Sequence, residues 1–67
     1  MRPEDAQAAE AREWLVRAHT DLRAADADLA VSPPLLDDVA FHSQQAVEKS
    51  LKAYLAWHNQ ASAAEGR

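Results

Sequence analysis

Residues 11–29, AREWLVRAHTDLRAADADL, carry the pattern that decides the fold of this chain. Small and large apolar residues recur in it at helical spacing, which predicts the apolar stripe of an amphipathic helix, and Trp14 joins the stripe on one side. Because the proline and the two acids at positions 3–5 suit the first turn of a helix, the predicted helix covers about residues 4–30. Alanine and leucine alternate along the stripe at steps of four and three residues, at Ala11, Leu15, Ala18, Leu22, Ala25 and Leu29.

A second helix is predicted after Ser32-Pro33-Pro34, because the paired prolines remove two backbone donors and disfavour helical geometry in the residues before them. It covers about residues 36–59, and the small polar tail over residues 60–67 is expected to fray. Its apolar arc is wider than one neighbouring helix can cover. The large residues of both stripes form the predicted packing and dimer seam: Trp14, Leu15, Leu22, Leu29, Leu36, Val47, Leu51, Tyr54 and Trp57.

The composition favours an all-α fold. Hydrophobic residues make up 48% of the chain, but half of them are alanine, and isoleucine is absent. We expect residues 1–67 to form a single partial domain, an antiparallel helical hairpin. Two helices cannot cover both apolar stripes, and the chain has no cysteine for a disulfide. The hairpin should therefore complete a four-helix bundle, either by dimerisation or with a missing C-terminal half.

The charge balance disfavours autonomous DNA binding, and the hydropathy pattern disfavours a membrane partner. The formal net charge is −4, whereas binding to a phosphate backbone normally requires a concentrated basic surface. No apolar run approaches the roughly 20 residues of a membrane span, and the N-terminus lacks the apolar stretch of a secretory signal. We expect a cytoplasmic protein without a membrane partner.

Polar residues line the side of the second predicted helix away from its apolar arc: His42, Gln45, Glu48, Lys49 and Lys52. One interpretation is a recognition strip for phosphate or for a partner carboxylate, and the neighbouring aromatic Phe41 supports it. The alternative, which the spacing alone favours, is a solvated face with a Glu48–Lys52 pair. On the first helix, Asp21 and Asp28 either bridge an interface or lie on a solvated edge, and the spacing favours the edge.

No pattern in the chain indicates a catalytic or metal centre. The three histidines, His19, His42 and His58, form no H-x-x-x-H pair, and the sequence lacks HExxH, a glycine-rich phosphate loop and any cysteine ligand. We expect no metal, no cofactor and no catalytic residue within these 67 residues. Ser43 and Ser50 fall beside the apolar stripe, where small residues permit close packing.

Two strings together resemble the first two helices of HEPN domains over about residues 12–58. The first is Trp14-Leu15-x-x-Ala18-x-x-Asp21-Leu22-x-x-Ala25-x-x-x-Leu29. The second and more distinctive string is FHSQQAVEKSLKAYL, residues 41–55. The residues that match the polar signature of the family are His42, Gln44, Gln45, Glu48, Lys49 and Lys52. This signature marks membership of the family and a polar face, not a nuclease centre.

The resemblance implies an all-α bundle of four or more helices, often dimeric, found beside minimal nucleotidyltransferase proteins in toxin–antitoxin systems. Many members are metal-independent endoribonucleases whose activity is associated with an Arg-x4-6-His motif in later helices. The given chain ends before that region. Arg12 and His19 match the motif formally, but they lie in the first helix and Glu13 follows the arginine, where a polar Asn, Asp or His is usual. We interpret this match as a coincidence.

The resemblance therefore implies a HEPN-like helical interaction module, non-catalytic as the chain stands, that self-associates and binds a partner protein or a nucleotide. The expected partners are a second copy of the chain and a minimal nucleotidyltransferase antitoxin. The alternative is the N-terminal half of a HEPN endoribonuclease toxin whose Arg-x4-6-His motif lies beyond Arg67. RNA would be a substrate only in that longer protein, so whether the protein is an enzyme stays open.

Overall fold

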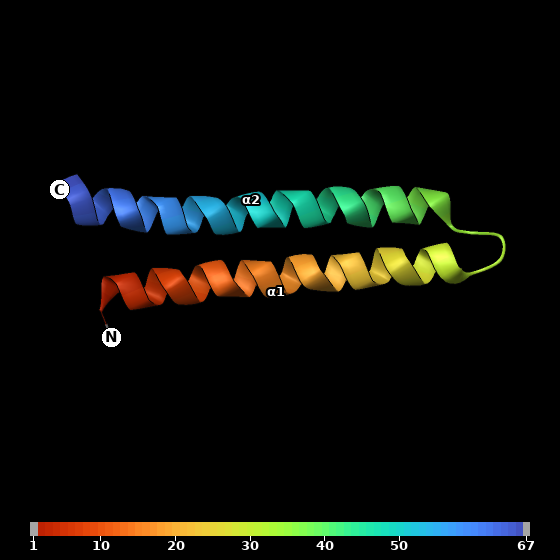
Figure 1. Ribbon diagram of the computed structural model, residues 1–67, viewed down its shortest axis with the longest axis horizontal. Coiled ribbons are helices and arrows are strands. Elements are labelled where there is room, and N and C mark those ends of the chain that lie inside the picture. Colours follow the sequence, from red (N-terminus) through yellow and green to blue (C-terminus); the bar gives the residue numbers. More distant parts are fainter. Residues whose placement is uncertain (1, 67) are drawn as a thin grey trace.

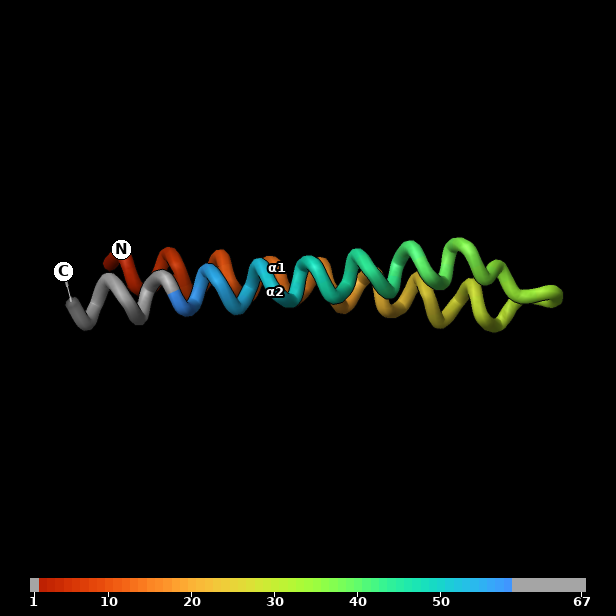
Figure 2. The backbone as a smooth tube through the Cα atoms, turned by 90° about the horizontal axis from the view of Figure 1, so that it is seen from above, coloured from red at the N-terminus to blue at the C-terminus, as the bar shows by residue number. Residues whose placement is uncertain are grey.

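The structure is a hairpin of two long antiparallel helices (Figure 1). The computed structural model describes the backbone of residues 2–66 and the side chains of residues 2–58. Helix α1 spans Pro3–Ala30, helix α2 spans Leu36–Gly66, and residues 31–35 connect them. In a view turned by 90° the two helices overlap along most of their length, so the hairpin is one layer of helices (Figure 2). The expectation of an all-α antiparallel hairpin is confirmed.

The ends of α1 follow from local chemistry. Pro3 occupies the first turn, where a missing N–H costs nothing, and Glu4 and Asp5 complement the positive end of the helix dipole. At the other end, Val31 has extended backbone angles, as expected just before the Ser32-Pro33-Pro34 break.

The connection is short and is tied back to α1. The backbone N–H of Leu35 donates to the carbonyl of Asp28 at 3.0 Å, and the Leu35 carbonyl accepts the N–H of Val39 in the first turn of α2. These bonds hold the connection where the chain reverses its direction after the prolines (Figure 1). Helix α2 then continues to Gly66, past residue 59, where the sequence predicts its end. The expected fraying of the tail, residues 60–67, falls on residues whose side chains lie outside the described part of the structure.

The seam between the helices is built from alanine. Ala11, Ala18 and Ala25 of α1 are buried, as are Ala46 and Ala53 of α2. In both helices these alanines recur once every two turns, so small residues meet along the whole line of contact and the helix backbones approach closely. The alanine seam is therefore the core of the hairpin.

The leucines of the α1 stripe are only partly covered by α2. Leu15, Leu22 and Leu29 each keep about half of their surface exposed, with Leu22 at 54%. The cause is geometric: once the alanines define the line of closest approach, residues four positions further along project to one side of it. The stripe thus divides into a buried alanine seam and an exposed row of leucines.

The hairpin is too thin to bury large side chains. Its Cα trace measures 53 × 19 × 9 Å, which corresponds to a single layer of helices. Among the described residues no large side chain is fully buried. Full burial of a large apolar side chain contributes about 1.5–3 kcal/mol. The large side chains of this hairpin are only partly buried, so each gains only part of that stabilisation. The large apolar side chains therefore contribute little to the core of the hairpin.

Candidate functional site

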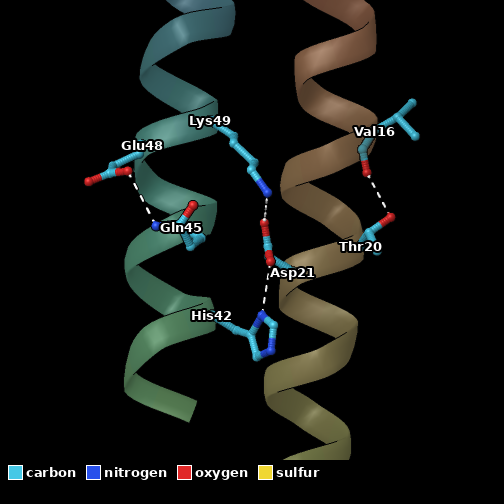
Figure 3. Close-up of polar contacts among 7 residues, drawn as sticks. All are labelled: Val16, Thr20, Asp21, His42, Gln45, Glu48 and Lys49. Atoms are coloured by element: carbon cyan, nitrogen blue, oxygen red, sulfur yellow. Dashed lines mark hydrogen bonds and ion pairs between the residues drawn. The ribbon is translucent and has the colours of Figure 1, made fainter. Parts of the chain in front are cut away.

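A buried carboxylate joins the two helices near their middle (Figure 3). Asp21 is 8% exposed and lies on α1 between Ala18 and Ala25 of the alanine seam. Two side chains of α2 reach it: Lys49 Nζ donates to Oδ2 at 2.5 Å, and His42 Nδ1 lies 2.9 Å from Oδ1. Since the two donors lie two turns apart on α2, they approach the carboxylate from opposite directions along the helix. We call Asp21, His42 and Lys49 the polar cluster.

The polar cluster keeps its carboxylate ionised. The hydrogen bond from Lys49 and then that from His42 lower the pKa of Asp21, against the opposing effect of burial. An ionised carboxylate only accepts hydrogen bonds, so Nδ1 of His42 carries the proton and donates it to Oδ1. Because both carboxylate oxygens have partners on α2, the cluster adds stability to one displacement of α2 along α1.

A second contact across the helices involves Trp14. The Lys52 ammonium lies 4.7 Å from the centroid of its indole ring, and the Arg17 guanidinium carbon lies 5.0 Å from the same centroid. Both distances fall within the range of cation–π attraction. Arg17 also forms an ion pair of 2.9 Å with Glu13. Trp14 is therefore held on the side of the hairpin that carries the polar cluster.

The other polar residues of the family signature lie at the edge of this side. Gln45 Nε2 donates to Glu48 Oε2 at a long 3.5 Å, and both side chains are exposed enough to reach solvent. Gln44 is exposed, and no hydrogen bond links it to the described residues. The ring of Phe41 meets that of His42 edge-on, with centroids 5.3 Å apart. These residues surround the polar cluster without belonging to it.

The structure changes the interpretation of the polar strip on α2. His42 and Lys49 were expected on a solvated face, but they point towards α1 and are only 29% and 26% exposed. Asp21 was expected on a solvated edge, and it is instead their buried acceptor. One signal in the sequence could have indicated this: Asp21 lies three residues after one seam alanine and four before the next, which is an interior position of the stripe.

The opposite side of the hairpin is apolar and exposed. With one exception, the residues of the predicted packing and dimer seam lie on this opposite side, as helical geometry requires. We call this surface the apolar face. The exposed fractions of these residues run from 51% for Leu29 to 63% for Leu36. Trp14 is the exception, since it packs beside Lys52 on the other side. The apolar face comprises Leu15, Leu22, Leu29, Leu36, Val47, Leu51, Tyr54 and Trp57.

Small residues hollow the apolar face in two adjoining places. One hollow lies over Ala8, Ala11 and Ala53, with Trp57 and Leu15 among its walls. The other lies over Ser43 and Ala46, with side walls of Leu22, Val47 and Leu51. Ser50 and Tyr54 line both hollows, so the two form one continuous uneven surface. Such a surface suits the knobs of another helix layer.

The formal Arg12–His19 motif lies at the outer edge of the apolar face. Both side chains are exposed, Arg12 at the rim of the first hollow, and no ion pair or hydrogen bond joins them in the described structure. Within residues 2–58, no three histidine or acidic side chains gather as a metal site would require. No described helix combines the length and the apolar character of a membrane span.

These features define a two-helix hairpin protein with an alanine seam, a buried cross-helix ion pair and an exposed apolar face. The family model of the HEPN domain matches residues 11–65, which is most of the chain. The protein therefore belongs to the HEPN domain family, as the two sequence strings indicated. The comparisons with curated proteins and with solved structures give no match.

Proposed function

We propose that this protein is a HEPN-type interaction module that associates through its apolar face with a second layer of helices. The observation that carries the proposal is the exposure of that face: eight large apolar side chains, each more than half exposed, lie on one side of the hairpin, whereas the buried residues among positions 2–58 are alanines and Asp21. Monomeric proteins rarely expose contiguous apolar surface of this extent.

The shape of the hairpin supports the same proposal. The broad face of its Cα trace measures 53 × 19 Å, or roughly 1,000 Å². A stable interface buries about 800 Å² on each partner. One face of the hairpin is therefore large enough for a stable complex without any contribution from the polar side.

Dimerisation, a nucleotidyltransferase partner, nucleotide binding and a cytoplasmic location remain predictions from the family. So does the alternative of a ribonuclease toxin, whose motif would lie beyond Arg67. The polar cluster adds no support for nucleotide binding, because Asp21 already takes the hydrogen bonds of both Lys49 and His42. We therefore place the binding surface on the apolar face.

The substitution Leu22→Asp tests the proposal, with Thr20→Asp as its control. Both residues are exposed on α1, but Leu22 lies on the apolar face, whereas Thr20 points away from α2 (Figure 3) and helical geometry turns it away from the apolar face. Sedimentation velocity at micromolar concentration should show an assembled wild-type chain and Thr20→Asp variant. The Leu22→Asp variant should be monomeric, because assembly would bury its charge. A monomeric, well-folded wild-type chain would refute self-association.

A further inference from the structure

One edge of α1 carries basic side chains that have no partner in the described part of the hairpin. Arg12, His19 and Arg23 are exposed, and none of them forms an ion pair or a side-chain hydrogen bond among residues 2–58. Val16 lies among them and is 61% exposed. We call these four residues the basic edge. We propose that the basic edge binds an acidic helical segment of another protein.

The four residues form one ridge because their spacing follows the helical repeat. Steps of four, three and four residues separate positions 12, 16, 19 and 23, so their side chains share one side of α1. This side faces away from α2, as the direction of Val16 shows (Figure 3). The two arginines lie about 16 Å apart along the helix axis, or about three turns. One straight partner helix can therefore reach both.

The two arginines of the basic edge differ from the other described cations, each of which has a partner inside the hairpin. Ion pairs or an aromatic contact hold Arg2, Arg17, Lys49 and Lys52. Acids are not scarce, since the chain has 11 of them against 7 lysines and arginines. Even Asp26, one turn beyond Arg23, makes no ion pair with it in the described structure. Both guanidinium groups therefore stay available to carboxylates of another molecule.

The negative net charge of the chain does not prevent an acidic segment from binding at this edge. The formal charge is −4, but exposed charges more than about 8 Å apart are largely screened at physiological ionic strength. Four of the acids lie in the first turns of the two helices, near the ends of the hairpin: Glu4, Asp5, Asp37 and Asp38. The local charge of the basic edge therefore governs its contacts.

Val16 favours a protein helix over a phosphate backbone as the occupant. Its exposed apolar side chain lies one turn from Arg12 and offers an apolar contact that phosphates would not use. A phosphate backbone also normally requires a denser basic surface than two arginines and a histidine. A helix with an acid, an apolar residue and a second acid on one face complements Arg12, Val16 and Arg23 one for one.

The basic edge borders the apolar face without belonging to it. Arg12 lies at the rim of the first hollow, whereas Val16 points away from α2 (Figure 3). A segment bound along the edge therefore leaves the apolar face free for a second layer of helices. The inference goes beyond the proposed function and does not depend on it.

A designed helical peptide tests the basic edge. It carries two glutamates eleven residues apart, with leucines four and seven residues after the first, so that all four side chains share one face. In either orientation one leucine then lies opposite Val16. The control peptide has the same composition, but its second glutamate is moved by two positions, to the other side of the helix. Fluorescence anisotropy with the full chain should show tighter binding of the matched peptide, which weakens as salt is added.

Charge reversal identifies the residues that hold the peptide. Arg23→Glu should weaken binding of the matched peptide by roughly 2- to 30-fold, because an attractive contact becomes a repulsive one. The control Arg2→Glu makes the same change in charge at an exposed site outside the basic edge and should bind as the wild type does. A double variant, Arg12→Glu with Arg23→Glu, should prefer a peptide in which lysines replace both glutamates. Circular dichroism should show the same helicity in every variant.

Four results would overturn the inference, and each leaves the test of the apolar face intact. Equal binding of the matched and control peptides would show that the edge does not recognise the spacing of the acids. Binding lost in Leu22→Asp but kept in Arg23→Glu would place the peptide on the apolar face. Displacement of the peptide by a single-stranded RNA oligonucleotide would assign the edge to a phosphate backbone. A changed sedimentation coefficient of the Arg23→Glu chain alone would assign the edge to the second layer of helices.

Discussion

The two sides of the hairpin differ in whether their side chains find partners within one chain. On the polar side, Asp21, His42 and Lys49 satisfy one another across the helices. On the apolar side, Leu22 and Tyr54 point outwards and stay more than half exposed. A polar group needs only one or two well-placed atoms, which a neighbouring helix supplies, whereas a large apolar side chain needs to be enclosed. The polar cluster is therefore satisfied within one hairpin, whereas the large side chains of the apolar face are not enclosed by it.

The largest effect is expected from widening the seam on which both sides depend. Ala18 is 4% exposed, and Ala18→Leu would force the helices apart and disturb the cluster at Asp21. We expect a loss of about 1–3 kcal/mol in the free energy of unfolding, as for other overpacked cores. Urea denaturation at fixed chain concentration measures it. The control Ala27→Leu adds the same side chain at an exposed site of α1 and should change little. Equal midpoints would contradict the alanine seam.

Removing the buried charge should have the next largest effect. In Asp21→Asn the side chain keeps its shape, but Lys49 loses its carboxylate and keeps a partly buried ammonium. The variant should unfold at a lower urea concentration than Asp28→Asn, which makes the same change one heptad further along α1. If the Asp28→Asn variant lost as much stability, the polar cluster would have no special role.

The polar cluster also predicts how stability depends on pH. The pKa of Asp21 is lowered from its ordinary value of 3.8 in the folded chain, so the folded state favours the ionised form. The resulting stabilisation is fully present above pH 3.8 and is lost as the pH falls through the lower, folded-state pKa. Thermal unfolding between pH 5 and pH 2 should therefore show a steeper acid decline for the wild type than for Asp21→Asn. Parallel declines would contradict this linkage.

The smallest effect is expected at the edge of the polar side. Lys52→Ala removes one cation from Trp14, while Arg17 stays 5.0 Å from the ring centroid. The loss should be about 0.5–1 kcal/mol, with helicity by circular dichroism unchanged. Lys52→Arg should keep the wild-type stability, because a guanidinium also attracts the indole ring. A loss of helicity comparable to that of Ala18→Leu would show that Lys52 supports the fold.

The candidate surfaces were predictable to different degrees. The apolar face follows from spacing, because Val47, Leu51 and Tyr54 fall on an arc too wide for one neighbour. The partners of His42 were not predictable, because periodicity gives directions around one helix but not the displacement of one helix along the other. Asp21 meets His42 and Lys49 only at the displacement that the connection and the alanine seam impose.

The sequence by itself determined two amphipathic helices, the proline break between them and membership of the HEPN family, since these depend on local propensity, spacing and motif. The tertiary structure decided which apolar residues became core. Alanine and leucine share one stripe in the sequence, but only the small alanines allow the helices their closest approach. The physical reason is that close packing selects the smallest residues for a two-helix seam, and this choice leaves the large ones on the exposed apolar face.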